Sequence, residues 1–227
     1  MGRSRHLVLA LALGLAAFAS ARPATAATPA PRGAPAARSI EPLDVTREFY
    51  KALHAGNARA AAKLTSASDA EPVLRSFVQI SRSYRTLEEA LAKRFGPEAA
   101  EQVGYGRKVQ SEIKALLGAT VEIDGDTARV AGLDGHTITT LKNVRGVWRV
   151  ELEEALETAD GRAAFAAQAR ATEGAAKKVV PRIRSGKYST PRAAVDDFEA
   201  QVARAAAGVR GGMPPERGAP EPEGTQL

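Results

Sequence analysis

The chain has 227 residues, of which 44% are hydrophobic and 26% charged, and this composition is typical of a globular protein with one domain or two small ones. It has no cysteine, which excludes disulfides, thiolate zinc sites and a lipid-modified cysteine. Its formal net charge is +6.

The N-terminal residues 1–26 have the pattern of a secretory signal peptide. Arg3 and Arg5 supply the positive start, and residues 7–18 form an apolar run that is too short to anchor stably in a bilayer. Small residues then lead to an Ala-x-Ala site that ends at Ala26. Cleavage after Ala26 predicts a secreted or periplasmic protein of a bacterial envelope, without a stable membrane span. The alternative is an uncleaved anchor, which the short apolar run disfavours.

Removal of this signal takes three arginines with it and lowers the net charge from +6 to +3. A charge this small gives weak support for nucleic-acid binding, and we predict no nucleic-acid partner. The mature chain keeps two histidines, His54 and His136, which without cysteine argue against a metal cluster. No metal site and no cofactor are therefore predicted.

Two segments flank the part of the chain that is predicted to fold. Residues 27–39 are rich in Pro, Ala and Gly, which is typical of a flexible linker. Residues 209–227 are rich in Gly, Pro and Glu, which is typical of a disordered tail. Residues 40–208 are predicted to form a single α+β domain.

The β pattern is confined to about residues 119–152. Apolar and polar residues alternate there in four short runs, which Asp124-Gly125, residues 132–135 and residues 143–146 interrupt. Asp-Gly supplies the positive φ of a tight hairpin turn. The third run alternates Ile138 and Thr140 with threonines. A four-stranded antiparallel meander follows, and helices must cover its apolar face because four strands cannot bury it alone.

Helical periodicity flanks this meander on both sides. The helices predicted before it span residues 41–55, 57–64, 72–95, 98–103 and 108–117, with a break at residues 104–106. Asn57 is placed to cap the second of these helices. After the meander comes an alanine-rich helix with an apolar stripe from Phe165 to Ile183, which Pro181 should kink or end. Thr190 and Pro191 then start a last helix, as a cap followed by proline at the first helical position.

Two stretches resemble the NTF2-like superfamily, which includes the SnoaL-like and ketosteroid-isomerase-like proteins. Residues 45–64 resemble its opening helix pair with a Gly-Asn break. Residues 121–130 and 141–152 resemble its closing strands, with an acidic-Gly-Asp turn and a Gly-x-Trp-x-Val end strand. The resemblance implies a cone-shaped fold with a pocket between a concave sheet and its helices. The chain departs from the family in two ways, since residues 72–117 lack a hairpin and helices follow the last strand.

Four polar residues are candidates for lining such a pocket, namely Tyr50, His54, Tyr84 and Tyr105. The resemblance implies that an isomerase would use a tyrosine together with carboxylates inside the cone. No Asp or Glu stands at an inward-facing strand position, where a general base would be needed. We therefore predict no catalytic residue, and the balance is against an enzyme.

The sharpest local charge feature is the run from Lys177 to Arg192, which holds six bases and no acid. Such a run, with Tyr188 inside it, could meet an anionic surface, or it could complement the helix dipole and the upstream acids. The six candidates for contact with an anionic surface are Lys177, Lys178, Arg182, Arg184, Lys187 and Arg192.

Three functions remain open from the sequence. The first is an exported, non-enzymatic NTF2-like domain that binds an apolar small molecule or another envelope protein, or that has a structural role. The second is a small-molecule isomerase or hydrolase that acts in the cone pocket, with Tyr50 or Tyr84 as hydrogen-bond donor. The third is an electrostatic adaptor that uses residues 177–192 on an anionic envelope surface.

Overall fold

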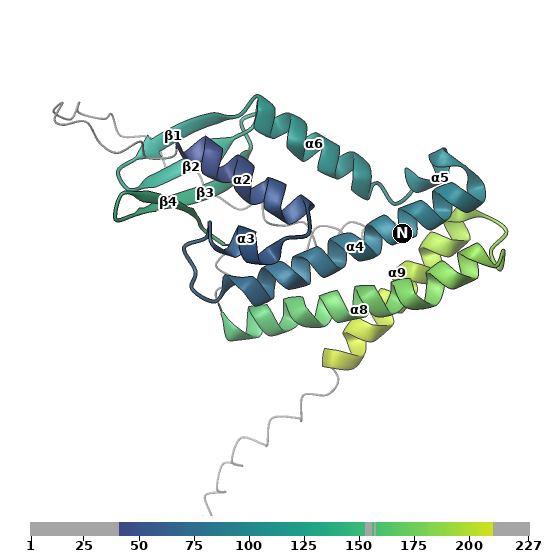
Figure 1. Ribbon diagram of the computed structural model, residues 1–227. Coiled ribbons are helices and arrows are strands. Elements are labelled where there is room, and N and C mark those ends of the chain that lie inside the picture. Colours follow the sequence, from purple (N-terminus) through teal and green to yellow (C-terminus); the bar gives the residue numbers. More distant parts are fainter. Residues whose placement is uncertain (1–40, 153–155, 157, 211–227) are drawn as a thin grey trace, which may run out of the picture.

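The computed structural model describes residues 41–152, 156 and 158–210 (Figure 1). The predicted signal peptide, the linker and residues 211–227 of the tail lie outside the described residues. The predicted α+β class is confirmed, because a four-stranded antiparallel sheet has helices before it and two long helices after it.

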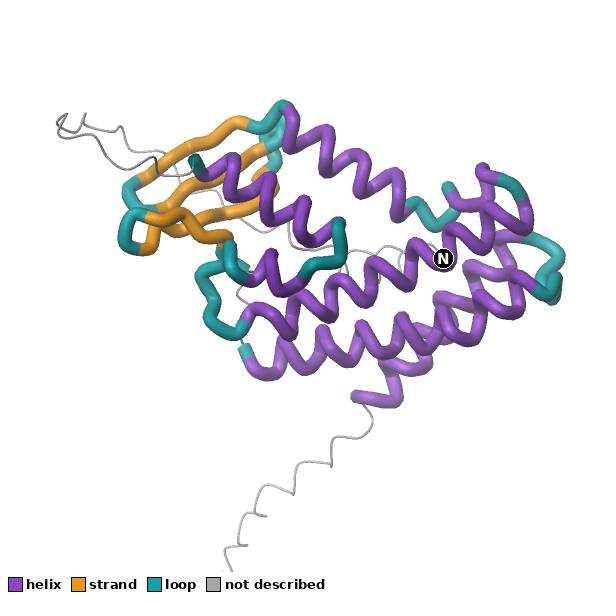
Figure 2. Tube along the Cα trace, viewed as in Figure 1, coloured by secondary structure: helices purple, strands orange, loops and turns teal. Residues whose placement is uncertain are grey.

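The helices before the sheet are α2 (Pro42–His54), α3 (Ala58–Ala62), α4 (Ala70–Phe95), α5 (Pro97–Ala100) and α6 (Tyr105–Leu117). The helices after it are α8 (Ala159–Arg184) and α9 (Pro191–Arg210) (Figure 2). Side chains cap two of these helices as predicted. The Ala60 N–H donates to Asn57 Oδ1 at 3.0 Å, and the Ala193 N–H donates to Thr190 Oγ1 at 3.2 Å.

The sheet is a meander in the order β1-β2-β3-β4, formed by β1 (Thr120–Asp124), β2 (Thr127–Ala131), β3 (Thr137–Val144) and β4 (Val147–Val150). Gly125 has a φ of 60° in the first turn, as the Asp-Gly signal predicts.

A register shift changes which residues of β3 face the core. Val130 pairs with Thr139, but Ala131 pairs with Thr137, so Ile138 is the extra residue of a bulge. Thr139 and Leu141 are buried, and Ile138 is half-buried at the bulge. The strict alternation predicted for this strand is therefore wrong at Ile138, because a bulge moves every later side chain to the opposite face.

The apolar face of the sheet is covered by α2, which contacts β1, β2 and β4 (Figure 1). The prediction that helices before the sheet cover its apolar face is therefore confirmed, with α2 as the covering helix. The most extensive contacts of α4 are with α8, which in turn packs on α9. The apolar stripe of α4 is used to build a helical layer, because α8 offers it a longer apolar surface than a short sheet could.

The alanine-rich stripe of α8 is buried as predicted, with Ala169, Thr172 and Ile183 fully inaccessible. Pro181 does not end α8, which continues to Arg184. Small side chains allow α8 to approach its neighbours closely. The buried residues of the sheet and of all long helices form one continuous cluster.

The two edge strands of the sheet, β4 and β1, differ in whether another segment pairs with them. Along β4, the Val150 N–H donates to the Leu64 carbonyl at 2.7 Å, and the Ser66 N–H donates to the Val150 carbonyl at 2.9 Å. The loop between α3 and α4 therefore covers this edge, with Thr65 bridging Val150. No described segment pairs with the outer edge of β1.

Candidate functional site

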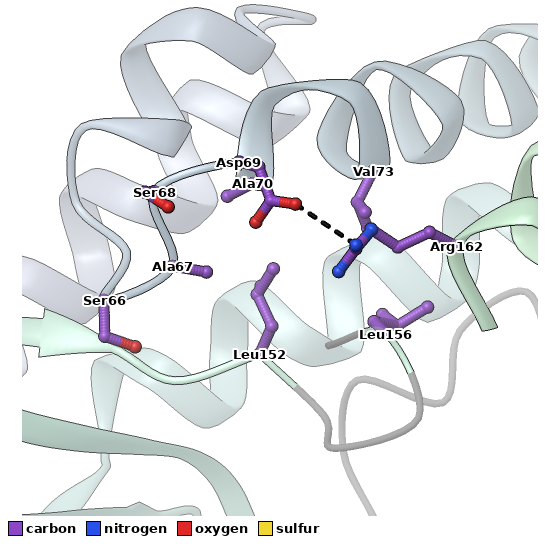
Figure 3. Close-up of a pocket in the computed structure, with 9 residues that line it drawn as sticks. All are labelled: Ser66, Ala67, Ser68, Asp69, Ala70, Val73, Leu152, Leu156 and Arg162. Atoms are coloured by element: carbon purple, nitrogen blue, oxygen red, sulfur yellow. Dashed lines mark ion pairs between the residues drawn. The ribbon is translucent and has the colours of Figure 1, made fainter. Parts of the chain in front are cut away.

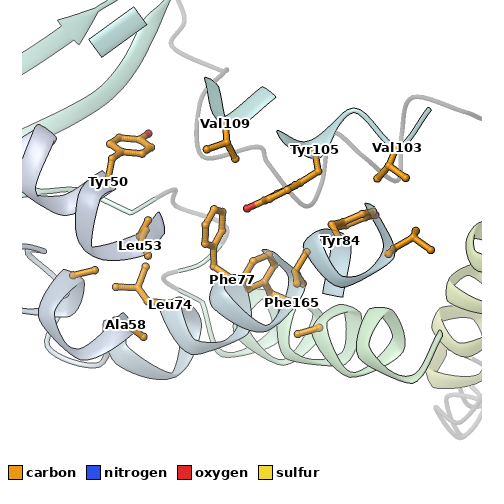
Figure 4. Packing of buried hydrophobic residues seen from close by; sticks show 14 of the residues in the cluster. Tyr50, Leu53, Ala58, Leu74, Phe77, Tyr84, Val103, Tyr105, Val109 and Phe165 are labelled. Carbon is orange, nitrogen blue, oxygen red and sulfur yellow. The ribbon is translucent and has the colours of Figure 1, made fainter. Parts of the chain in front are cut away.

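The four predicted pocket residues come from three helices, α2, α4 and α6. Figure 4 shows the three tyrosines among them in the packed interior. Tyr50 and His54 come from α2, Tyr84 from α4 and Tyr105 from α6. The tyrosine residues are 6%, 5% and 3% exposed, so all three reach the interior as predicted. They occupy that interior as packed side chains.

Tyr84 and Tyr105 stack on each other, with ring centroids 5.8 Å apart and planes at 9°. Burial, with a smaller contribution from Glu199, raises the pKa of Tyr84 to about 12. Burial also raises the pKa of Tyr105. Both phenols are therefore neutral at physiological pH, and the stack joins α4 to the start of α6.

The start of α6 differs from the prediction, which placed a break at Gly104, Tyr105 and Gly106 and began the helix at residue 108. Gly104 has a φ of 72°, and α6 begins at Tyr105. The Gly106 N–H donates to Glu88 Oε1 at 3.0 Å, which replaces a side-chain cap and fixes α6 on α4.

The imidazole ring of His54 is largely buried. His54 ends α2, and both of its ring nitrogens are buried without a hydrogen-bond partner among the described residues. Nε2 lies 3.7 Å from Glu112 Oε2 on α6, which is too long for a hydrogen bond. Burial, helped by the Arg85 guanidinium, lowers the pKa of His54, so the ring is neutral at pH 7 and the contact is not an ion pair.

The carboxyl group of Glu112 is half-buried between charged neighbours. Burial raises its pKa, and the ammonium group of Lys108 opposes this shift. Arg85 donates to the His54 carbonyl at 3.0 Å rather than to Glu112. A neutral histidine beside a glutamate is a combination that can serve in general acid–base catalysis. A substrate would also need space beside it.

A cavity of about 290 Å³ lies elsewhere, at the junction of the sheet with α4 and α8 (Figure 3). None of the four pocket candidates lines it. Asp69 and Arg162 form an ion pair across it at 3.3 Å. Its described lining consists of Ser66, Ala67, Ser68, Asp69, Ala70, Val73, Leu152, Leu156 and Arg162.

The chemistry of this lining does not suit the apolar small molecule that the sequence suggested as a partner. Two serines and an ion pair would lose hydration without gaining hydrogen bonds. Sequence reasoning missed this cavity because its polar residues come from distant parts of the chain. Asp69 precedes α4 and Arg162 lies in α8, and no local spacing pattern connects them.

One acid of α8 and two acids of α9 form ion pairs with three of the six bases in the basic run. Lys177 pairs with Glu173 at 2.7 Å, Arg182 with Asp197 at 3.1 Å and Arg192 with Asp196 at 2.9 Å. Tyr188 also donates to Asp197, and this hydrogen bond is the largest of the causes that lower the pKa of that carboxyl group. Lys178, Arg184 and Lys187 are exposed, and none of them has an ion pair with a described residue.

Sequence reasoning also missed three exposed apolar side chains at the end of α6. Ile113 is 38% exposed, Leu117 73% and Leu133 82%. Ile113 and Leu117 lie four residues apart on α6 and share a face. The side chain of Leu133 lies over Gly118, where a Cβ atom would come within 2.8 Å of it. The signal that could have revealed this exposed leucine cluster (Ile113, Leu117 and Leu133) is a leucine inside a Gly-Leu-Asp-Gly turn.

Comparisons with protein-family models, with curated proteins and with solved structures returned no match. Among the described residues, no group of three or more His, Asp or Glu side chains could hold a metal ion. Within the same residues, no helix is both long and apolar enough to cross a bilayer.

The lowered pKa of His54 predicts a pH-dependent stability. The unfolded chain binds the proton at a pKa of about 6.5 and the folded chain only at lower pH, so stability falls as the pH drops below about 6.5. The slope should reach at most about 1.4 kcal/mol per pH unit. Protonation of Glu112 acts in the opposite direction nearer its own raised pKa. Urea titrations between pH 7 and 5 measure the free energy of unfolding of the wild type and of His54→Gln. The two values should diverge as the pH falls, by at most about 1.4 kcal/mol per pH unit. Parallel curves for the two proteins would contradict the prediction.

Proposed function

We propose that the chain is an exported, non-enzymatic domain that binds another protein of the cell envelope through the exposed leucine cluster. The observation that carries the proposal is the position of Leu117 and Leu133, 73% and 82% exposed, at one end of the sheet. Contiguous exposed apolar side chains mark protein contacts more often than scattered ones do. Binding would remove these side chains from water.

The position of the pocket candidates favours this function over an isomerase or hydrolase. The rings of Tyr84 and Tyr105 stack on each other, and the Tyr50 hydroxyl donates a hydrogen bond to the Ile138 carbonyl at 3.3 Å. The cavity of about 290 Å³ lies away from His54 and from the tyrosines. A reacting group bound in this cavity would therefore not contact the residues that could act on it.

The electrostatic adaptor is less well supported than the protein-binding function. Three of its six bases are held in ion pairs by Glu173, Asp196 and Asp197. Exposed pairs of this kind are weak, but each lowers the local positive potential that an anionic surface would meet.

Two further parts of the proposal rest on the sequence pattern. The N-terminal charge, the apolar run and the Ala-x-Ala site support export. The helix pair α2 and α3, set before an antiparallel meander, supports an NTF2-like scaffold. The packing of α4 on α8 departs from a cone in which the long helix covers the sheet, so we propose the scaffold for α2, α3 and the sheet alone.

Site-specific photo-crosslinking in cells that produce the protein tests the proposed contact. A photoreactive amino acid at position 133 is expected to give one discrete adduct with another protein. Leu117→Ser should reduce its yield about tenfold, because loss of one central apolar contact costs about 1–2 kcal/mol of binding. Sequencing of the crosslinked chain should begin at Ala27, since the proposal includes export.

The matched control carries the same photoreactive group at position 178, on the exposed face of α8. It should give no discrete adduct. Equal adducts at both positions, or none at position 133, would refute binding through the leucine cluster. An intact Met1 on the crosslinked chain would refute cleavage of the signal.

A further inference from the structure

The open edge of β1 is the second surface feature at this end of the molecule. Its first residue, Thr120, pairs with Ala131 and follows Leu117 by three positions. The exposed leucine cluster therefore adjoins the start of β1. In an antiparallel pair, every second residue directs its N–H and C=O groups away from its partner strand. These groups of β1 are free to pair with an added strand, because no described segment lies along them.

The two faces of β1 differ in chemistry. Val121 and Ile123 belong to the face that α2 covers, because Ile123 pairs with the fully buried Ala128. Ile123 nevertheless remains 59% exposed, since it stands at the rim of that face. The opposite face of the strand presents the exposed carboxylates of Glu122 and Asp124.

We propose that β1 accepts an extended peptide segment of a partner protein in which apolar and basic residues alternate. This inference rests on the proposed function and names the partner's chemistry and where it docks. Backbone hydrogen bonds to β1 would supply affinity. Apolar side chains of the segment would cover Val121 and Ile123, while its Lys or Arg side chains would face Glu122 and Asp124.

A second copy of this chain is a poor occupant of the same edge. Antiparallel pairing of β1 with its own copy along the whole strand places Glu122 opposite the Glu122 of the copy. A shift by two residues towards the turn places Glu122 opposite Asp124 of the copy. Like charges directly opposite each other destabilise a strand pair, so these acids select against self-pairing.

The contrast with β4 supports the same conclusion. Its edge is closed by backbone hydrogen bonds at 2.7 and 2.9 Å from the loop around Thr65. That loop leaves β1 as the edge where addition of a strand costs no existing hydrogen bond in the described part of the chain. The sheet can therefore grow in one direction, beside the leucine cluster.

The test uses the full-length chain and a nine-residue peptide in which valine and lysine alternate. Amide hydrogen exchange, followed by NMR at saturating peptide, should slow at least tenfold for the outward-pointing amides of β1. A peptide with glutamate in place of lysine should bind at least tenfold more weakly. Ile123→Lys should weaken binding of the lysine peptide about tenfold, because it removes an apolar contact and adds a like charge.

The matched control is Val147→Lys, since Val147 is 49% exposed and belongs to β4. This variant should change peptide affinity less than twofold. Binding without slower exchange in β1, or equal weakening by both variants, would overturn the inference. Dimers whose β1 amides are protected without peptide would also overturn it, in favour of a second copy. Discrete crosslinking from position 133 together with no peptide binding would leave the proposed function standing and refute strand addition alone.

Discussion

Replacing Phe198 by alanine is expected to lower the free energy of unfolding by about 3–5 kcal/mol. Phe198 is 1% exposed, and its ring meets the Tyr84 ring edge-on at a centroid distance of 5.5 Å. It therefore joins α9 to α4, and its loss leaves a cavity between helices that are far apart in the sequence. Urea denaturation followed by circular dichroism measures the change.

The control for this prediction is Leu133→Ala, which also truncates a large apolar side chain. Leu133 is 82% exposed, so this variant should change the free energy of unfolding by less than about 0.5 kcal/mol. If Phe198→Ala cost less than about 1 kcal/mol, α9 would not unfold together with α4. The predicted extension of the fold by C-terminal helices would then be a separate unit.

Ala169→Leu is expected to destabilise the protein by about 1–3 kcal/mol through overpacking. Ala169 is fully inaccessible, on the face of α8 that also buries Phe165 and Thr172. Interiors are packed as densely as organic crystals, so a larger side chain must push the neighbouring helices apart. Thermal unfolding should show the loss as a lower midpoint temperature.

The matched variant on the same helix is Ala164→Leu. Ala164 is exposed, and leucine has nearly the same helix propensity as alanine, so the change should stay within about 0.5 kcal/mol. Equal effects of the two substitutions would show that the alanine stripe does not set the spacing of the helices. The comparison separates packing from propensity.

Local signals in the sequence predicted the parts of the fold that depend on local geometry. Gly125 adopts the positive φ that its turn requires, and Asn57 and Thr190 cap the helices that they were expected to cap. The period of the apolar residues predicted the buried stripe of α8. Each of these features is determined within one or two turns of chain, which is the range over which a pattern can be read.

Local patterns could not predict which element packs against each apolar helix face. The stripes of α2 and α4 are both apolar, and an apolar stripe specifies burial without specifying what buries it. The sequence therefore predicted that helices before the sheet cover it, but it did not show that α2 is the helix that does so.

For the candidate sites too, the sequence predicted burial but not which distant residues come together. Burial of Tyr50 and Tyr84 was predictable, since each lies on the apolar face of a predicted helix. The stacking of Tyr84 on Tyr105 was not predictable, because the two rings come from different helices. For the basic run, the sequence offered only the helix dipole and the upstream acids as partners, and it did not show that α9 places Asp196 and Asp197 beside it.

The packing of α4 against α8 has a consequence for the order in which the chain can fold. The meander and α6 separate these helices in the sequence, so their contact closes a long loop and carries a large entropic cost. The strands can pair early through short hairpins, but the apolar stripe of α4 stays uncovered until the C-terminal third has been synthesised. Such a chain remains without its native helical layer until α8 has been synthesised.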